Sequence, residues 1–392
     1  MLNRMLNGLS ELTNVFRNEL KRSLTDSGVV LIFVVAVIAY PVLYSIGYMN
    51  ETVKNVPVAV VDHDQTNYSR QYSQMMDATE QISVTCKPGS LKEAEALFYD
   101  DRVSGIILIP DHFEKDILQR KPVVVSVYCD ASRFLLYKQV LQGAAVSSGI
   151  FSSGIEFRKL MVGGKMPEPA VVQTDPLHSD LFSLYNPSSA YATFIVPGIL
   201  LIVIQQSLLI GIGLLAGAQN EKRKENGGSL PGSIPGHVIP SILGKASAYV
   251  FIYLFTSLFM LGVFYHWMNF PEKGNFLSFY LMLVPYLFTV SFAGLSLGFL
   301  FRKRVNALML VVFISPMVFF FSGVSWPVQS MPLLLRALTY LFPSTAAIPA
   351  FIKLRIIGGG IGSIKGEWCL LMSQMVFFFS TACFAFYRLR KL

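Results

Sequence analysis

The residues best suited to chemistry are Asp62, His63 and Asp64, in the stretch DHDQTNYSR. Adjacent carboxylate and imidazole groups are typical ligands of divalent metals. A metal site would need a further His, Cys or acidic residue at a suitable spacing, and the sequence offers none there. The stretch lies between an apolar run and a helix-period run, where Asp64 or Thr66 would cap a helix. We therefore expect a helix cap at this position.

Motifs for nucleotide hydrolysis and nucleophilic catalysis are absent from the sequence. The stretch SILGKAS contains Gly244 and Lys245, but it lacks the earlier glycine of a phosphate-binding loop and ends in Ala246. The five histidines are scattered, and neither HExxH nor CxxC occurs. The glycine run IIGGGIGSIKG at 356–366 follows no strand, so we interpret it as a flexible loop. These observations predict that the chain is not an enzyme and binds no cofactor itself.

Long uncharged segments dominate the chain, because 53% of its residues are hydrophobic and only 14% are charged. A helix needs roughly 20 apolar residues to cross a hydrocarbon layer of about 30 Å. Segments of this kind without Asp, Glu, Lys or Arg occur at about 28–48, 191–217, 246–268, 275–301, 305–327 and 368–387. The sequence therefore predicts a polytopic α-helical membrane protein with six transmembrane helices, the first at 28–48 and the others within a domain at 188–392.

Basic residues occur in alternate connections between these helices. The N-terminal segment, the 218–245 loop, the 302–304 turn and the C-terminal tail each carry at least three. Short loops rich in Lys and Arg stay in the cytoplasm, so we expect both termini to be cytoplasmic. We interpret the net charge of +8 as this topology signal and expect no nucleic-acid partner.

A polar insertion at 49–187 separates the first two helices, and this orientation places it outside the cytoplasm. Apolar runs VPVAVV, QISVTC, VSGIILI and VVVSVYC alternate with helix-period stretches such as LKEAEALFYDD and HFEKDILQ. This alternation predicts an extracytoplasmic α/β domain with a small, partly parallel sheet, followed by a longer helix over about 132–162. Cys86 and Cys129 lie near ends of expected strands, and the sequence leaves open whether they form a disulfide.

Three glutamines are the main polar side chains inside the expected spans. Gln205 and Gln206 lie in the second span and Gln374 in the last. They could hydrogen-bond between helices or line a substrate path. Ion-coupled transporters usually carry ionisable residues within their spans, and here only His266 comes near such a position.

Two segments are expected to contact the membrane without crossing it. Residues 1–27 have apolar side chains at helical spacing with basic residues between them, which predicts an amphipathic cytoplasmic helix. Residues 328–360 are apolar but interrupted by prolines, which predicts an outer re-entrant hairpin. In the second span, Gly213 and Gly217 form a GxxxG that permits close helix approach, for example at a subunit interface.

Three stretches resemble the permease subunits of bacterial ABC-2 type exporters, in the branch with a large outer domain after the first helix. They are VPVAVVDHDQTNYSR at the start of the outer domain, YNPSSAYATFIVPGILL at 185–201 with the charged loop that follows, and FFFSGVSWPVQSMPLLLRALTYLFPSTAAIPAF at 319–351. Their order along the chain agrees with the topology above. The resemblance implies a multi-pass protein of the bacterial cytoplasmic (inner) membrane.

The resemblance also implies that the 218–245 loop couples the helices to a separate ABC ATPase subunit, which would use ATP and Mg²⁺. The residues that match the family's acidic, Gly-ended loop are Glu221, Arg223, Glu225, Asn226 and Gly227. The following stretch GSLPGSIPGHVIP departs from the family pattern, because Pro231, Pro235 and Pro240 oppose a regular coupling helix.

The function implied by this resemblance is an export permease for an amphiphilic, lipid-like or drug-like substrate. Two copies, or one copy with a homologous permease, would enclose the path, and a periplasmic adaptor and an outer-membrane channel are further partners that the branch implies. Two alternatives stay open. One is an ion-coupled secondary transporter, which the uncharged spans disfavour; the other is a surface receptor or sensor anchored by the helices.

Overall fold

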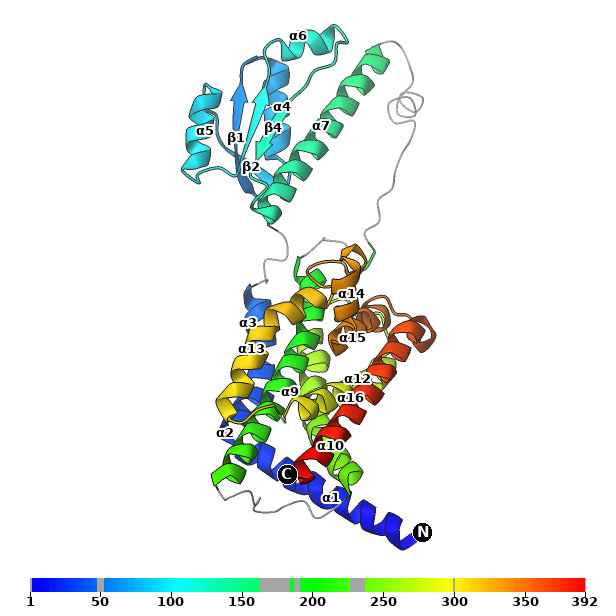
Figure 1. The fold of residues 1–392 in the computed structure, drawn as a ribbon. Coiled ribbons are helices and arrows are strands. Elements are labelled where there is room, and N and C mark those ends of the chain that lie inside the picture. Colours follow the sequence, from blue (N-terminus) through cyan, green and yellow to red (C-terminus); the bar gives the residue numbers. More distant parts are fainter. Residues whose placement is uncertain are drawn as a thin grey trace. The chain divides into compact units, whose positions relative to one another are not determined.

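The computed structural model describes residues 2–47, 53–162, 184–186, 191–225, 237–298 and 300–391 (Figure 1). The chain forms two compact units. Met1–Glu51 and Ser183–Leu392 make up the helical unit, and Thr52–Phe182 make up the α/β unit.

The α/β unit is built on a four-stranded sheet in the order β2-β1-β3-β4. Its strands are β1 (Val56–Asp62), β2 (Ile82–Cys86), β3 (Gly105–Ile109) and β4 (Ser126–Cys129). β2 and β3 run parallel to β1, and β4 is antiparallel to β3. The prediction of a small, partly parallel sheet is therefore confirmed.

Helices cover both faces of this sheet, which explains why β1 and β3 are almost continuous apolar runs. One face packs against α5 (Leu91–Tyr99) through a cluster that includes Val61 and Ala94. The other face packs against α4 (Asn67–Asp77) and α7 (Phe134–Val162). The short helix α6 (Phe113–Leu118) contributes Phe113 to this second cluster. Figure 1 shows α5 on one side of the sheet and α7 on the other.

The stretch DHDQTNYSR caps α4, as the sequence predicted. The Thr66 hydroxyl accepts the N–H of Ser69 at 3.4 Å, and the Ser69 hydroxyl accepts the N–H of Thr66 at 3.0 Å. Asp64 Oδ2 accepts the N–H of Glu114 and so ties this turn to α6 at 2.9 Å. Among the described residues, no group of three His, Cys, Asp or Glu side chains could hold a metal ion.

Cys86 and Cys129 are free thiols. Cys86 ends β2 at one edge of the sheet, and Cys129 ends β4 at the other edge. Strands in a sheet lie about 4.8 Å apart, so three strand spacings separate the two residues by roughly 14 Å. A disulfide requires Cα atoms within about 7 Å, and the pairing that the sequence left open is therefore ruled out.

In the described part of the helical unit, six helices are long and apolar enough to cross a membrane, as predicted. The first combines α2 (Ser27–Val30), the π-helix η1 (Leu31–Ala36) and α3 (Val37–Gly47). The others are α9 (Tyr191–Glu225), α10 (Val238–Leu258) with its continuations η2 (Phe259–Phe264) and α11 (Tyr265–Trp267), α12 (Phe276–Leu297), α13 (Arg304–Phe321), and α16 (Lys365–Lys391) preceded by the 3₁₀ turn η5 (Ile361–Ile364).

The connection between α9 and α10 differs from the loop expected at 218–245. α9 continues to Glu225 and α10 begins at Val238, while residues 226–236 lie outside the described part of the chain. The sequence EKRKE consists of good helix formers, and its basic residues suit the negative end of the helix dipole. Pro240 does not oppose the helix, because it lies in the first turn of α10, where a backbone N–H would have no helical partner.

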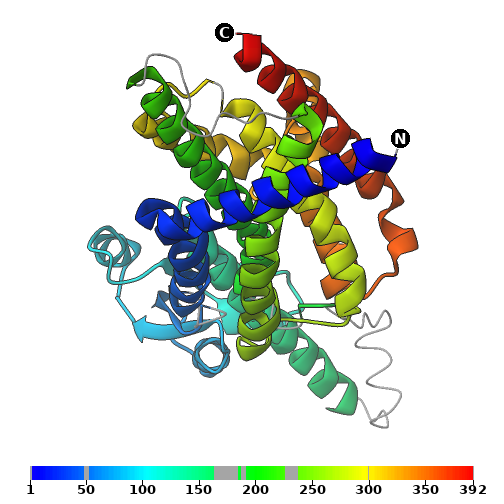
Figure 2. The same ribbon diagram turned by 90° about the horizontal axis from the view of Figure 1, so that it is seen from below.

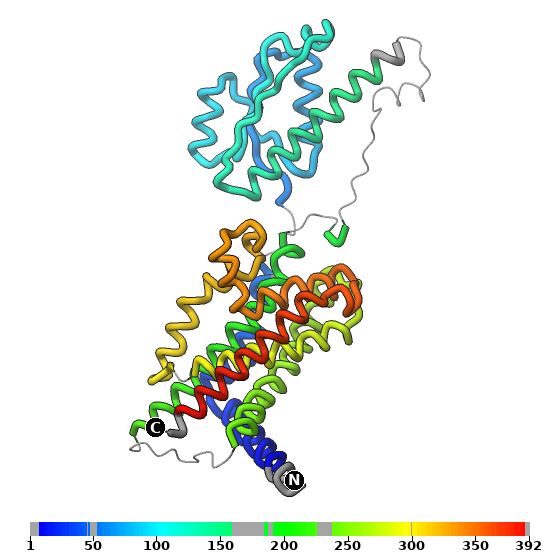
Figure 3. The backbone as a smooth tube through the Cα atoms, turned by 45° about the vertical axis from the view of Figure 1, so that its right-hand side comes forward, coloured from blue at the N-terminus to red at the C-terminus, as the bar shows by residue number. Residues whose placement is uncertain are grey.

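The predicted hairpin segment is a pair of short helices bent at residues 340–342. It contains the 3₁₀ turn η3 (Val328–Ser330), α14 (Leu333–Thr339), α15 (Pro343–Phe351) and the π-helix η4 (Ile352–Ile356). The two halves, Leu333–Thr339 and Pro343–Ile356, meet at 80°. Figure 3 shows this segment, in orange, and the N-terminal helix, in blue, at opposite ends of the helical unit.

The N-terminal helix α1 (Leu2–Thr25) packs against α10 of the same chain. Figure 2 shows α1 lying across the helical unit. Phe16 contacts Phe251 edge to face, with ring centroids 6.0 Å apart. Gly244 lets the two backbones approach, since a Cβ there would lie 2.8 Å from the carbonyl oxygen of Leu12.

α9 is the central helix of this unit and packs against α3, α12, α13 and α15. Its GxxxG motif faces α13, because a Cβ on Gly213 would lie 2.7 Å from the Ala307 Cβ, and one on Gly217 would lie 2.8 Å from the backbone N and Cα of Arg304. The sequence suggested a subunit interface for this motif, but its partner is a helix of the same chain.

Gly217 lies too close to the backbone of α13 to accept a side chain. Gly217→Ala would place a methyl group against backbone that cannot rotate away, and we expect a net loss of about 1–2 kcal/mol after the gain in helix propensity. The measurement is the thermal unfolding midpoint in detergent. Gly366→Ala in α16 is the control, since a Cβ there meets nothing within 4 Å. Equal midpoints for the two variants would contradict the packing described here.

Candidate functional site

Among the described residues of the helical unit, several charged contacts between helices lie at one end. It consists of α1, Asp26, residues 218–225, residues 237–245 and the turn at 302–304, and we call it the basic end. Figure 1 shows α1 and the C-terminus at this end. The described residues that the sequence predicts to couple to a partner lie at this end.

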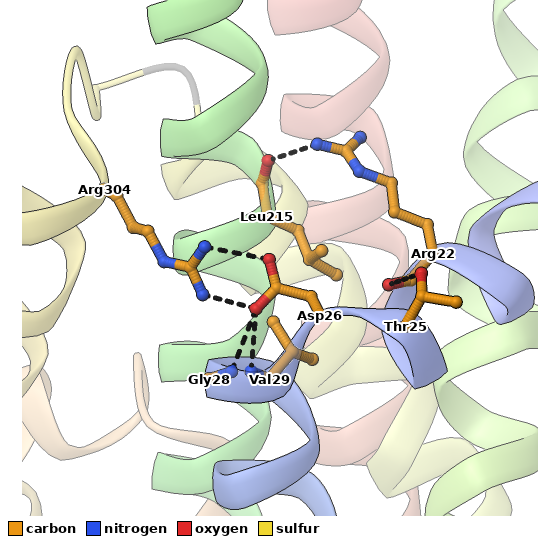
Figure 4. Close-up of polar contacts among 7 residues, drawn as sticks. All are labelled: Arg22, Thr25, Asp26, Gly28, Val29, Leu215 and Arg304. Atoms are coloured by element: carbon orange, nitrogen blue, oxygen red, sulfur yellow. Dashed lines mark hydrogen bonds and ion pairs between the residues drawn. The ribbon is translucent and has the colours of Figure 1, made fainter.

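Asp26 joins the start of the first span to α13 (Figure 4). Its Oδ1 accepts the N–H groups of Gly28 and Val29 at 3.1 Å each, which caps α2. The same carboxylate pairs with both terminal nitrogens of Arg304, and Nη1 lies 2.8 Å from Oδ2. The hydrogen bonds from Arg304 hold the pKa of Asp26 below its usual range. Asp26 is therefore ionised at neutral pH, and the contact is a two-point, charge-assisted pair.

Glu221 caps the other side of this junction. Arg304 is the first residue of α13, and its backbone N–H donates to Glu221 Oε1 at 3.1 Å. The N-cap residue of α13 offers no side-chain acceptor of its own, so Glu221 supplies one, and its charge suits the positive end of the helix dipole. Next to it, the Asn220 amide donates to the carbonyls of Gly298 at 3.2 Å and Phe301 at 2.8 Å.

A buried ion pair ties α1 to α10. Glu19 and Lys245 are 5% and 6% exposed, and Glu19 Oε2 lies 3.7 Å from Lys245 Nζ. Glu19 also accepts the Tyr249 hydroxyl, and Lys245 donates to the Gln219 amide oxygen at 3.3 Å. Because α10 begins earlier than expected, Lys245 falls inside a membrane-crossing helix. The expectation of spans without charges is therefore wrong at this position.

Arg22 completes the set of contacts at the basic end. Its guanidinium donates to the carbonyl of Leu215 in α9 at 3.1 Å (Figure 4). Polar contacts thus join α1, α2, α9, α10 and α13 at one end of the helical unit. A displacement of any one of these helices would have to break charged or buried hydrogen bonds in its neighbours.

The five residues predicted to couple to an ATPase lie in different settings. Glu221 points into the chain and caps α13. Arg223 is partly buried. Glu225 is exposed and makes no hydrogen bond or ion pair with the described residues. Asn226 and Gly227 lie outside the described residues. Glu225 is therefore the acidic member of this set whose side chain is accessible to a partner.

Two of the three span glutamines hold the bend of the hairpin. Gln205 Oε1 accepts the N–H of Ser344 at 2.9 Å. Gln374 Nε2 donates to the carbonyls of Tyr340 at 2.6 Å and Phe342 at 3.3 Å. The bend keeps a few short-range backbone hydrogen bonds, but the last carbonyls of α14 and the first N–H groups of α15 have no full set of helical partners. In a nonpolar environment every such group needs an internal partner. Gln205 and Gln374 supply these hydrogen bonds from α9 and α16.

Gln206 differs from the other two glutamines. It is 8% exposed, and neither atom of its amide has a hydrogen-bond partner within the described part of the chain. Burying an unpaired amide carries a free-energy cost. Gln205 and Gln374 each use one amide atom to tie helices together and leave the other, Gln205 Nε2 or Gln374 Oε1, without a partner among the described residues, whereas both amide atoms of Gln206 are unpaired.

The sequence interpretation missed Arg355, a charged residue of η4 that is 1% exposed. Its guanidinium lies 2.7 Å from Glu272 and donates to the carbonyl of Leu261 at 3.1 Å. Three rings lie 5.1–5.9 Å from it, those of Tyr265, Phe276 and Phe279. Arg355 lies outside the six uncharged segments, so a search for charges within them could not find it. The cluster of aromatic residues between 264 and 280 was the available signal, since aromatic faces attract cations.

Comparison with known proteins identifies one family. The family model described as "ABC-2 family transporter protein" matches residues 27–384, which include the α/β unit, the first five membrane-crossing helices and most of the sixth. None of the curated proteins matches the chain.

The hydrogen bonds at the bend predict different effects for the three glutamines. Methionine has nearly the length of glutamine but cannot form these bonds, so Gln205→Met and Gln374→Met should each cost about 1–3 kcal/mol of unfolding free energy. Gln206→Met should be neutral or stabilising, because it removes an unpaired amide. Thermal unfolding in detergent compares the three. If Gln206→Met lowered the unfolding midpoint while Gln205→Met and Gln374→Met did not, the hydrogen bonds assigned to the three glutamines would be wrong.

Proposed function

We propose, since the chain belongs to the ABC-2 family of transporter proteins, that it is the permease subunit of an ATP-driven exporter. The observation that carries the proposal is the family match over 27–384, together with six membrane-crossing helices and no recognisable nucleotide-binding motif in the sequence. A protein built in this way provides the path and takes its energy from another subunit.

We place the basic end on the cytoplasmic side of a bacterial inner membrane, because connections rich in Lys and Arg stay on that side. The separate ATPase, which uses ATP and Mg²⁺, would dock there. The exposed charges available to it include Lys222, Lys224 and Glu225 at the end of α9 and Arg302 and Lys303 beside α13. In this topology residues 49–187 would be extracytoplasmic, and a periplasmic adaptor and an outer-membrane channel could meet the α/β unit there.

α9 gives the proposed ATPase a mechanical connection to the hairpin. Glu221 follows Gln205 by 16 residues, which is about 24 Å along an α-helix. Glu221 is hydrogen-bonded to the start of α13, and Gln205 is hydrogen-bonded to Ser344 in the first turn of α15, just after the bend. Movement of α9 at the basic end would therefore reach the backbone of the hairpin through hydrogen bonds at both places.

The path is proposed to form with a second permease, either another copy or a homologue. α13 and α16 bury only 22% and 17% of their apolar windows within the chain, compared with 78% for α9. Their remaining apolar surface must be covered by lipid or by a partner helix. We propose an amphiphilic, lipid-like or drug-like substrate, and among the three glutamines we assign a substrate contact to Gln206, whose amide is unpaired.

The direct test is co-purification from gently solubilised native membranes. We expect the tagged protein to retain a soluble subunit with a phosphate-binding GxxxxGK[ST] motif. Glu225→Lys should reduce recovery about fivefold, corresponding to roughly 1 kcal/mol lost from a charged contact at an interface. Glu95→Lys in α5 is the matched control, because Glu95 is also exposed but belongs to the α/β unit.

The experiment distinguishes failure of the proposed energy source from failure of the proposed docking surface. Recovery of no such ATPase with the unaltered protein would contradict the proposed energy source. Equal recovery with Glu225→Lys would reject the docking surface but leave the permease assignment in place. Transport that stops when the ion gradient is removed, while ATP is still present, would favour the ion-coupled alternative.

A further inference from the structure

The α/β unit contains a pocket of about 760 Å³ between α6, the segment that leads from α6 into β4, and α7. This volume is within the usual range for sites that bind small molecules. The lining residues that decide its chemistry are Tyr72, Phe113, Arg120, Lys121, Phe151 and Glu156. None of them was singled out by the sequence interpretation.

Three aromatic rings form one wall of the pocket. The rings of Phe113 and Phe151 are stacked, with centroids 5.9 Å apart and planes at 28°. The Tyr72 ring lies 5.8 Å from Phe113 and 5.2 Å from Phe151. All three side chains belong to the buried core of the unit, so the packing fixes their orientation. The rings are only 1–7% exposed, so this wall lies at the floor of the pocket, and the partly buried aliphatic lining residues Ile117, Val123, Val125 and Ile155 complete the apolar surface. Such a surface suits a flat apolar group.

The rim of the pocket carries more positive than negative charge. Lys121 Nζ lies 3.9 Å from Asp116 Oδ1, a loose pair at an exposed position. Arg120 is exposed and forms no ion pair with any residue that the structure describes. Glu156, on α7, is the acidic residue of the lining, and it too forms no ion pair with the described residues. An anionic ligand group would therefore be attracted to Arg120 and would lie best away from Glu156.

We propose that this pocket binds a small amphipathic anion. Its flat aromatic or alicyclic body would lie on the wall of Tyr72, Phe113 and Phe151, and its carboxylate or sulfonate would pair with Arg120. A cationic amphiphile would instead place its charge beside two basic side chains. The pocket lies wholly within the α/β unit, so the inference does not depend on the proposed transport function.

Two fluorescent probes with the same ring system test this inference. 8-Anilinonaphthalene-1-sulfonate carries the anionic group, and N-phenyl-1-naphthylamine lacks it. The full chain is titrated with each probe in phosphatidylcholine nanodiscs, and the signal of empty nanodiscs is subtracted. We expect saturable binding of the sulfonate. Arg120→Gln should weaken it about three- to fivefold, the effect of losing one exposed charged contact, and should leave the uncharged probe unaffected. Glu156→Gln should leave sulfonate binding unchanged or make it tighter.

A second pair of variants tests the location. Ser152 lines the pocket, whereas the neighbouring Ser153 does not, and both are exposed on α7. Ser152→Phe should fill the pocket and abolish saturable binding, and Ser153→Phe should leave it unchanged. Equal binding to these two variants would overturn the proposal. Weaker sulfonate binding with Glu156→Gln, or tighter binding with Arg120→Gln, would contradict the assigned ligand charge.

Discussion

The carboxylate of Asp26 has two partners, and the basic end of the helical unit depends on both. It caps the first helix that enters the membrane, and it forms a two-point ion pair with the first residue of α13. The two residues are 278 positions apart in the sequence. Arg304 also receives a cap from Glu221 through its backbone N–H. A single junction therefore fixes the relative positions of the first span, α9 and α13.

At the hairpin end, buried backbone groups likewise need polar partners from other helices. The backbone between α14 and α15 breaks at 340–342 in a segment of apolar helices, and side chains must replace the hydrogen bonds that the helix no longer supplies. Gln205 and Gln374 do so from α9 and α16. Because α9 takes part in both junctions, it is the element through which force from an ATPase would reach the hairpin in the function that we propose.

The sequence predicted features that are encoded locally. Apolar periodicity and uncharged runs were sufficient for the six spans, the four strands and the cap at Thr66. The sequence did not predict contacts between residues that are far apart in the chain. For Glu221, the sequence could not show that its carboxylate accepts the backbone N–H of Arg304, which is 83 positions away. Lys245 was excluded from a span because the start of α10 was expected after it. The distance between Cys86 and Cys129 could be inferred only once the strand order was known. The ion pair and the rings around Arg355 join distant parts of the chain, and the family resemblance did not reveal them.

The charges of Asp26 and Arg304 act together to hold the helices at the basic end. A double-mutant cycle measures this directly, with Asp26→Asn, Arg304→Gln and the double variant unfolded by sodium dodecyl sulfate titration. Asparagine can still cap α2, so the cycle isolates the ion pair from the cap. We expect a coupling between the two charges, so that the double variant loses less stability than the sum of the single losses, by about 1 kcal/mol or more. Additivity within about 0.3 kcal/mol would contradict it.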